Sequence, residues 1–213
     1  MSRNPNRVYD RRTKSTSDTW LTPPEITKAL GTFELDPASP ISPPWNIAKR
    51  HYTEEDDGLA QKWTDRVWLN PPYGHQIEKW MKKMVEHGNG IALVGCRTET
   101  RWFHDWVWNA ADAVFFLKGR LRFYRADGTQ DGTAAFPSCL VAYGRQNVEA
   151  LRRSGLEGHL VEMGKDFGRV QNNRLRGFGF RGRMTSREHS HFFRKRNIQR
   201  AAKAMNNHQG GRE

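Results

Sequence analysis

The chain has 213 residues and a mass of 24.7 kDa, enough for one domain of ordinary size with a modest extension but not for two full domains. Charged residues make up 27% and mean hydropathy is -0.86, yet 11% aromatic residues are too many for a wholly disordered chain. No stretch approaches the roughly 20 apolar residues of a membrane span and no signal peptide is visible, which predicts a soluble, cytoplasmic protein. Two cysteines, Cys96 and Cys139, exclude a disulfide framework and are expected to be buried, reduced thiols.

The formal net charge of +12 is concentrated at the two ends of the sequence. Residues 1–19 carry five Lys or Arg and two acids, residues 20–164 carry 17 and 18, and residues 165–213 carry 13 and three. Basic ends on a neutral body predict a polyanionic partner, because Lys and Arg release counterions from phosphates; a solvated tail without function is the alternative. We predict a flexible leader at 1–18, a folded domain at 19–164 and a basic, nucleic-acid-binding extension at 165–213.

The folded body shows helical and strand patterns in alternation. Thr22 and Glu25 have the spacing of a capping box, with Pro23 in the first turn of the helix. In chain order we predict a helix capped by Thr22 through residue 30, strands at 33–36 and 66–69, a helix at 76–87, a strand at 90–94, a helix at 99–110, strands at 112–117, 120–124 and 138–143, a helix at 147–153 and a strand at 159–161.

This alternation predicts an α/β fold. Strands that alternate with helices favour a mainly parallel sheet covered on both faces. The segments 120–124 and 138–143 follow each other without a helix, across turn residues such as Gly128, and predict an antiparallel hairpin. In open parallel sheets ligands bind beyond the carboxyl ends of the strands, which draws attention to Asp36 and Asn70.

The tetrapeptide Asn70-Pro71-Pro72-Tyr73 is the clearest chemical signal. Two prolines fix the backbone and remove two N–H donors, which leaves a carbonyl and the Asn70 side chain as acceptors at the end of a strand. An exocyclic amine on a nucleobase is a poor nucleophile, because its lone pair is delocalised into the ring. Two acceptors that bind the hydrogens of this amine free the lone pair for attack, and Tyr73 could stack on the face of the base. The alternative is an ordinary Asn-Pro turn with a core tyrosine. The setting favours chemistry, because the motif follows an apolar strand and precedes an amphipathic helix.

Five strings in this order resemble the phage-type DNA N6-adenine methyltransferase (Dam-like) family, over about residues 18–145. They are Trp20-Leu21-Thr22-Pro23, Phe33-Glu34-Leu35-Asp36-Pro37-Ala38, Tyr52-Thr53-Glu54-Glu55-Asp56-Asp57-Gly58-Leu59, Val67-Trp68-Leu69-Asn70-Pro71-Pro72-Tyr73 and Gly119-Arg120-Leu121-Arg122-Phe123. The resemblance implies a Rossmann-like methyltransferase fold, S-adenosylmethionine as methyl donor and adenine in duplex DNA as acceptor, flipped out of its stack. It also implies a bacteriophage enzyme of the kind associated with restriction-modification.

The resemblance also implies roles for individual residues. Asn70, Pro71, Pro72 and Tyr73 match the catalytic motif. Trp20, Thr22 and Pro23 match positions that line the methionine end of the cofactor. Asp36 and Pro37 lie at the end of the first strand, where the Asp36 carboxylate would face the ammonium group of the cofactor. Asp57 matches a position near the adenosine. The glycine-rich loop of many methyltransferases is missing after Asp36, and a solvated loop is the alternative for Asp57.

Nucleic-acid contacts are expected from arginines in two regions. For Arg97 and Arg101, the alternative is a structural segment in which Thr98 caps the next helix. For Arg120 and Arg122, the alternative is that charged side chains on an edge strand prevent aggregation. The arginines are Arg97, Arg101, Arg120 and Arg122 in the body, and Arg174, Arg176, Arg181 and Arg183 among the phenylalanines and glycines of the tail. No metal is expected, since His189 and His191 lack a third ligand in the sequence.

Two other functions are compatible with the sequence. The same tetrapeptide serves methyltransferases that act on RNA adenines or on glutamine amides, and the basic tail disfavours the protein substrate but not RNA. A catalytically silent DNA-binding module on a methyltransferase scaffold would explain the missing glycine-rich loop. Binding of S-adenosylmethionine distinguishes this module from the enzymes.

Overall fold

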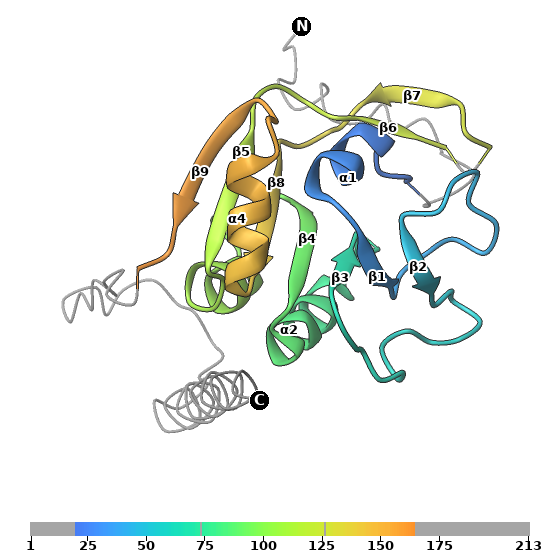
Figure 1. The fold of residues 1–213 in the computed structure, drawn as a ribbon, viewed down its shortest axis with the longest axis horizontal. Coiled ribbons are helices and arrows are strands. Elements are labelled where there is room, and N and C mark those ends of the chain that lie inside the picture. Colours follow the sequence, from blue (N-terminus) through green and yellow to red (C-terminus); the bar gives the residue numbers. More distant parts are fainter. Residues whose placement is uncertain (1–19, 73, 126, 165–213) are drawn as a thin grey trace, which may run out of the picture. The chain divides into compact units, whose positions relative to one another are not determined.

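A computed structural model describes residues 20–72, 74–125 and 127–164, all within one compact unit (Figure 1). The predicted leader and the basic extension lie outside the described residues. In chain order the elements are α1 (Pro24–Leu30), β1 (Phe33–Asp36), β2 (Ala48–His51), β3 (Val67–Leu69), α2 (Ile77–His87), β4 (Gly90–Gly95), α3 (Arg101–Phe103), the π-helical segment η2 (His104–Trp108), β5 (Ala113–Leu117), β6 (Arg122–Tyr124), β7 (Gln130–Thr133), β8 (Ser138–Tyr143), α4 (Arg145–Arg153) and β9 (Gly158–Glu162).

Seven strands form one mixed sheet in the order β2-β1-β3-β4-β8-β5-β9. Its β2, β1, β3 and β4 strands pair in parallel, whereas β8 pairs antiparallel with both β4 and β5, and β9 pairs antiparallel with β5. Three of the six pairings are therefore parallel and three are antiparallel. The α/β class was predicted, but a mainly parallel sheet is not confirmed.

The antiparallel hairpin has a different partner from the predicted one. β6 pairs with β7 in a separate two-stranded sheet, and the 138–143 segment inserts between β4 and β5 as β8. All six residues of β8 are buried. A strand without a polar face needs cover on both sides, which a hairpin at the margin of the domain cannot give.

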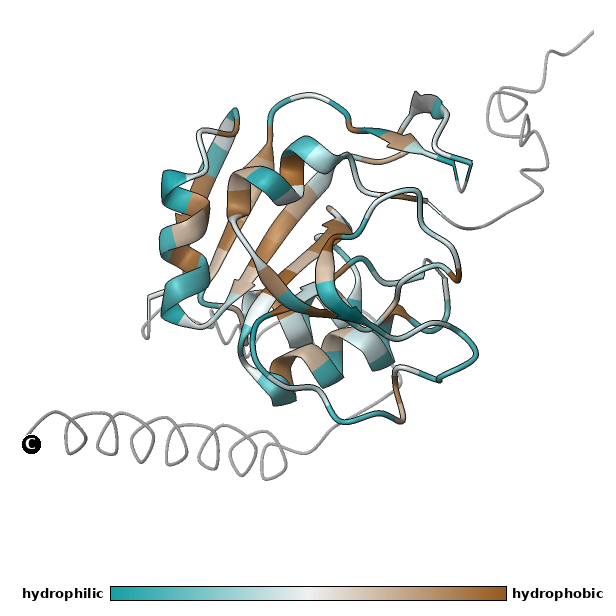
Figure 2. Cartoon of the chain, turned by 45° about the vertical axis from the view of Figure 1, so that its right-hand side comes forward, coloured by the Kyte–Doolittle hydropathy of each residue, from teal (hydrophilic) through white to brown (hydrophobic). Residues whose placement is uncertain are grey.

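Hydrophobic residues are concentrated in the strands of the large sheet and in stripes on the helices that cover it (Figure 2). Phe33, Trp68 and Ile91 pack in one cluster with the buried residues of α1 and α4. The opposite face meets α2 and the helical segment that follows β4, where the Tyr143 hydroxyl donates to the Trp106 carbonyl at 2.6 Å. The sheet is thus covered on both faces, as the sequence pattern predicts.

Two local predictions are wrong, and one strand was not predicted. Pro23, not Thr22, is the N-cap of α1, and the side chain makes no capping hydrogen bond. Helix α3 begins after Thr100 rather than after a Thr98 cap and continues as a π-helical turn. The β2 strand was missed, because Lys49 and Arg50 are exposed at the sheet edge and the strand lacks apolar alternation.

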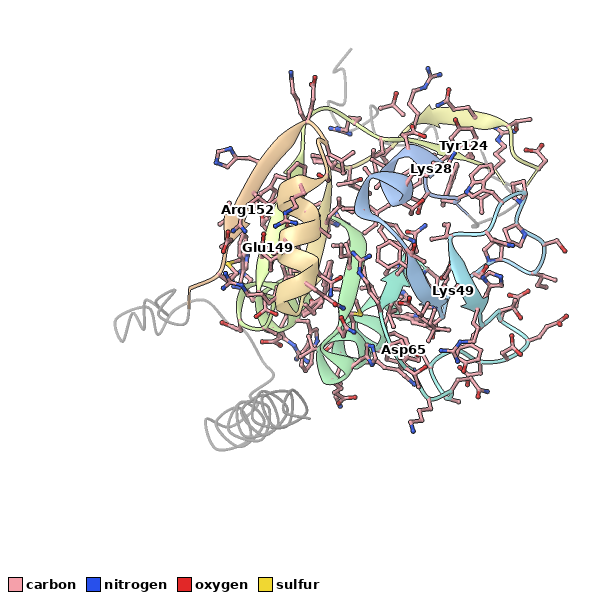
Figure 3. All side chains as sticks on the ribbon, viewed as in Figure 1. Lys28, Lys49, Asp65, Tyr124, Glu149 and Arg152 are labelled. Carbon is pink, nitrogen blue, oxygen red and sulfur yellow. The ribbon has the colours of Figure 1, made fainter. Side chains whose placement is uncertain are left out.

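The described domain contains surface ion pairs and two free cysteines. On α4, Arg152 pairs with its neighbour Glu149 and with Glu162 of β9 (Figure 3). Cys96 and Cys139 are both free; Cys139 is buried, as predicted, whereas Cys96 is only half-buried. No helix in the described part of the chain is long and apolar enough to cross a membrane.

Arg66, just before β3, holds the start of the sheet together and gives a stability prediction. Its guanidinium donates to the Leu30 and Thr32 carbonyls at 2.9 and 2.8 Å and to Asn147 Oδ1 at 2.7 Å. Arg66→Met keeps the apolar stem but removes these donors, so we expect urea denaturation to show about 3 kcal/mol less free energy of unfolding.

The matched control is Arg50→Met. Arg50 is exposed and pairs with Asp65 at 3.3 Å, so its loss should cost less than about 1 kcal/mol. Equal losses in the two variants would show that the Arg66 hydrogen bonds do not stabilise the fold.

Candidate functional site

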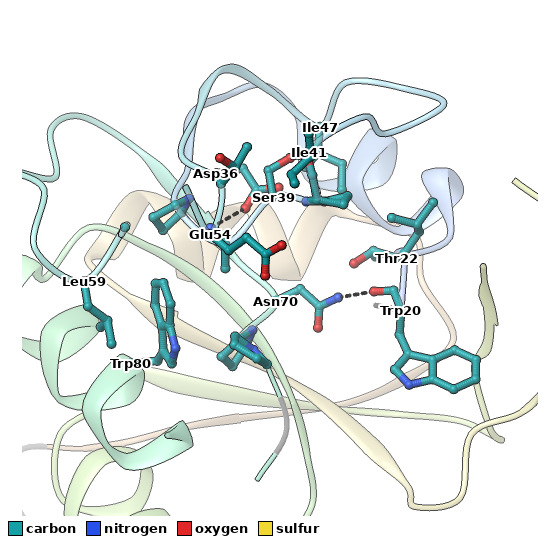
Figure 4. Close-up of a pocket in the computed structure, with 18 of the residues that line it drawn as sticks. Trp20, Thr22, Asp36, Ser39, Ile41, Ile47, Glu54, Leu59, Asn70 and Trp80 are labelled. Carbon is teal, nitrogen blue, oxygen red and sulfur yellow. Dashed lines mark hydrogen bonds between the residues drawn. The ribbon is translucent and has the colours of Figure 1, made fainter. Parts of the chain in front are cut away.

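Two neighbouring strands end beside a single cavity. β1 ends at Asp36, and β3 ends at Leu69, directly before Asn70. Because the two strands are parallel, their carboxyl ends lie at one edge of the sheet. Asp36 and Asn70 both line a cavity of about 640 Å³ at this edge (Figure 4). Other sequence-predicted residues that line it are Trp20, Thr22, Pro37, Asp57, Pro71 and Pro72.

The Asn70 side chain has a fixed orientation with a free acceptor. Its amide nitrogen donates to the Trp20 carbonyl at 2.8 Å. Its Oδ1 atom is buried and has no hydrogen-bond partner in the described structure. A buried amide oxygen without a partner costs free energy, which a ligand N–H donor at this position would recover. Pro71 is buried and Pro72 exposed, whereas Tyr73 lies outside the described residues.

Asp36 is a buried carboxyl group in the wall of the cavity. It is 5% exposed, and its Oδ1 atom accepts a hydrogen bond from the Ala38 backbone N–H at 3.1 Å. Burial raises the pKa of Asp36 from 3.8 to about 7, and the hydrogen bond from Ala38 offsets only part of this effect. A cationic ligand beside this group would lower its pKa, because it would supply a counter-charge that none of the described lining residues provides.

The charge of the cavity is negative. Its lining includes three carboxylate residues, Asp36, Glu54 and Asp57, while none of the described lining residues is Lys, Arg or His. Such a wall attracts cations and repels phosphate. The cavity therefore fits a small cationic ligand, and a nucleic-acid backbone would have to stay outside it.

The segment before α1 forms the wall opposite the acids. Leu21 and Tyr124 of β6 exchange two backbone hydrogen bonds, at 2.8 and 3.1 Å, which fix this segment. Thr22 is fully buried, and its hydroxyl has no partner among the described residues. Pro23 does not line the cavity but caps α1 behind it. Thr22 thus offers the cavity a second unsatisfied polar atom beside Asn70.

Close backbone contact holds the loop of Asp57 against the end of β1. A Cβ atom on Gly58 would lie 1.9 Å from the Pro37 carbonyl oxygen, so only glycine fits there. The Gly58 carbonyl accepts a hydrogen bond from the Trp63 indole at 2.8 Å. Asp57 itself has φ 48°, a conformation that Asp tolerates better than most residues. The loop after Asp36 has no glycine, but Gly58 allows the loop that contains Asp57 to pack closely against the backbone of Pro37.

Trp80 is a cavity residue that sequence reasoning missed. The helical pattern places it on the apolar face of α2, and it is 7% exposed and stacked on Trp63 with ring centroids 6.1 Å apart. Its side chain nevertheless faces the cavity from the side of Leu59 (Figure 4), and its indole nitrogen has no partner within the described ranges. Helical periodicity alone cannot separate a core position from a cavity wall, since both are apolar.

The predicted DNA-contacting arginines have different surroundings. Arg101 forms ion pairs with Glu78 at 3.0 Å and Asp105 at 3.6 Å, and Arg120 donates to two backbone carbonyls. Both arginines thus have structural partners. Arg97 is exposed and stacks on a phenylalanine ring, and Arg122 is exposed on β6. The tail residues Arg174, Arg176, Arg181 and Arg183 lie outside the described residues.

The residues described do not contain a group of three or more His, Cys, Asp or Glu that could hold a metal ion. His189 and His191 lie outside the described ranges. Searches of curated proteins and of solved structures found no match to the chain. Residues 10–154, more than half of the sequence, match the family described as DNA N-6-adenine-methyltransferase (Dam). This match agrees with the resemblance seen in the five sequence strings, and the chain belongs to the Dam family of DNA N6-adenine methyltransferases.

Proposed function

We propose that the protein transfers a methyl group from S-adenosylmethionine to the N6 amine of adenine in duplex DNA. The observation that carries the proposal is the Asn70 Oδ1 atom, which has no partner in the described structure and is held at the end of β3 beside a cavity lined by three acidic residues. The family match supports the class of reaction. We further propose a Rossmann-like domain, a cytoplasmic protein and a phage-encoded gene.

The cavity fits the proposed cofactor in charge and in hydrogen bonding. When bound, S-adenosylmethionine would supply an electrophilic methyl group on a positively charged sulfur. Asp36 would hold its ammonium group, and Thr22 and Trp20 would contact the methionine end. Asp57 and Trp80 would hold the adenosine, with the Trp80 indole N–H as a donor. The Thr22 hydroxyl and the Trp80 indole nitrogen have no partner in the described structure, and the buried carboxyl group of Asp36 has a raised pKa that a bound cation would lower.

Asn70 and Pro71 would orient the target amine. Asn70 Oδ1 accepts a hydrogen bond from the amine, and the Pro71 carbonyl accepts a second, which directs the nitrogen lone pair into the cavity. The hydrogen bond to Trp20 holds the Asn70 amide with its oxygen toward the ligand. Asparagine does not take up a proton, so the amine releases its proton to solvent after transfer.

A mass-spectrometric assay tests the reaction and its acceptor. Purified full-length protein is incubated with S-adenosylmethionine and unmethylated duplex DNA, and the nucleosides are then analysed. N6-methyl-2′-deoxyadenosine should appear among the nucleosides from DNA. Methylation of RNA alone would replace DNA by RNA as acceptor. Absence of cofactor binding by calorimetry would favour the silent binding module instead.

Gly58→Ala should weaken binding of S-adenosylmethionine at least about tenfold, because Pro37 or the Asp57 loop must move to admit the Cβ atom. Isothermal titration calorimetry measures this affinity. Gly95→Ala is the matched control, since a Cβ there meets no atom closer than 3.9 Å. Wild-type affinity in Gly58→Ala would mean that the packing of this loop does not shape the cofactor site.

A further inference from the structure

Phe136 is an exposed aromatic residue without an assigned role. Among the described residues, Phe136 and Ile41 are the exposed large apolar side chains, at 47% and 54%. Ile41 lines the cavity, whereas Phe136 does not. A single exposed phenylalanine is not by itself evidence of a partner, so its position and its neighbours decide what it can do.

Phe136 stands at the same edge of the sheet as Asn70. Leu69 pairs with Ala92 on β4, and Gly95 at the end of β4 pairs with Ser138 at the start of β8. Phe136 Cβ lies 3.9 Å from the position of a Cβ atom on Gly95, and with strands about 4.8 Å apart this end of β4 and β8 lies within about 10 Å sideways of β3. Phe136 therefore lies at the edge of the sheet that carries Asn70, so DNA that flanks a base held at Asn70 would pass this edge.

The ring is held in place by groups that fix both the side chain and the backbone. The Arg97 guanidinium lies over the Phe136 ring, 4.2 Å from its centroid. The Cys96 N–H donates to the Pro137 carbonyl at 2.8 Å. Arg120 donates to the Ala134 and Ala135 carbonyls at 3.0 and 2.7 Å. A fixed ring loses little side-chain entropy when a ligand covers it.

We propose that a base of the DNA next to the target adenine stacks on the exposed face of Phe136, while Arg97 covers the other face and faces a phosphate. The inference rests on the proposed function for its substrate. An aromatic ring stacks on any base, and an arginine beside it attracts the backbone, so the pair suits DNA better than an apolar protein surface. The contact supplies affinity and positions the strand without selecting a sequence.

Photo-crosslinking tests the contact directly. Full-length protein is mixed with duplexes in which 5-iodouracil replaces thymine on either side of adenines, and is irradiated. Mass spectrometry should locate a crosslink on the peptide that contains Phe136. Crosslinks confined to other peptides, although the duplex is bound, would overturn the proposal.

Fluorescence anisotropy with a labelled duplex gives a second test. Phe136→Ala should weaken binding about 5- to 100-fold with little change in the salt dependence, and Phe136→Leu should not restore it. Arg97→Ala should lower the salt slope by about one, whereas Arg145→Ala, on α4 at the opposite edge, should leave it unchanged. Calorimetry with S-adenosylmethionine checks that each variant is folded.

The outcomes separate this contact from the proposed reaction. If wild type methylates DNA and Phe136→Ala binds the duplex equally well, the contact is wrong and the reaction stands. If binding depends on Phe136 but no methylated adenine forms, the contact stands and the reaction is wrong. If wild type does not bind DNA at all, both are wrong.

Discussion

Replacing Asn70 with alanine should lower the rate of adenine methylation by about 10²- to 10³-fold, the usual cost of removing one positioned polar group from a reacting centre. The loss removes the acceptor that has no partner in the described protein. It also removes the donor to the Trp20 carbonyl. Single-turnover measurement of methylated adenine, with saturating cofactor, isolates the effect on the chemical step from any change in cofactor affinity.

Two further variants test neighbouring polar atoms of the site, and the first separates the acceptor of Asn70 from its donor. Asn70→Asp keeps an acceptor oxygen and should retain more activity than Asn70→Ala. Thr22→Val removes a buried hydroxyl that makes no described hydrogen bond and should weaken cofactor binding without loss of stability. A fully active Asn70→Ala variant would rule out amine orientation by this residue.

Asp36→Asn should weaken binding of S-adenosylmethionine about 30- to 1000-fold, because the cofactor's ammonium group would lose its buried counter-charge. Calorimetry at pH 7.5 measures the difference. Glu34→Gln is the matched control on the same strand, since Glu34 lies outside the cavity and pairs with Lys49 at 3.6 Å. Equal affinities of wild type and Asp36→Asn would exclude Asp36 as the partner of the ammonium group.

The pH dependence follows from the raised pKa of Asp36. Because the ligand needs the carboxylate and the free protein has a pKa of about 7, affinity should rise about tenfold per pH unit below pH 7 and level off above it. The free energy of unfolding changes in the opposite direction. The folded state binds the extra proton between pH 4 and 7, so stability falls across this window, by up to about 4 kcal/mol for this group.

Asp36→Asn should remove both the pH dependence of cofactor affinity and the pH dependence of stability. Urea titrations of the free protein between pH 5 and 8 measure the pH dependence of stability. An unchanged pH dependence of stability in Asp36→Asn would assign it to other groups.

The sequence predicted those features that depend on local pattern. Apolar runs that end in a polar residue and proline located β1 and β3, and so placed Asp36 and Asn70 at the edge where the cavity lies. Helical spacing located α2, α4 and the cover on both faces. The pairing of strands was harder to predict, because β8 pairs with β4 through residues that are distant in sequence. The β2 strand was not predicted because it lacks a pattern of apolar residues.

The site was predicted in the same uneven way. The sequence predicted the site residues that belong to a motif. Trp80 and Phe136 belong to no motif, and only the structure shows that Trp80 lines the cavity and that Phe136 is exposed. The predicted capping role of Thr22 is wrong because Pro23 is the N-cap of α1, and the Thr22 hydroxyl has no partner in the described structure. The roles of Tyr73 and of the tail arginines stay predictions, since those residues lie outside the described structure.

The backbone bridge between Leu21 and Tyr124 limits how the protein can be re-engineered. The β6–β7 hairpin is inserted between β5 and β8, yet its Tyr124 carbonyl and amide hold the segment whose Trp20 carbonyl orients Asn70. The hairpin is therefore not an interchangeable module. A graft that gives this protein another hairpin must preserve the main-chain geometry at residue 124, or Asn70 loses its orientation with it.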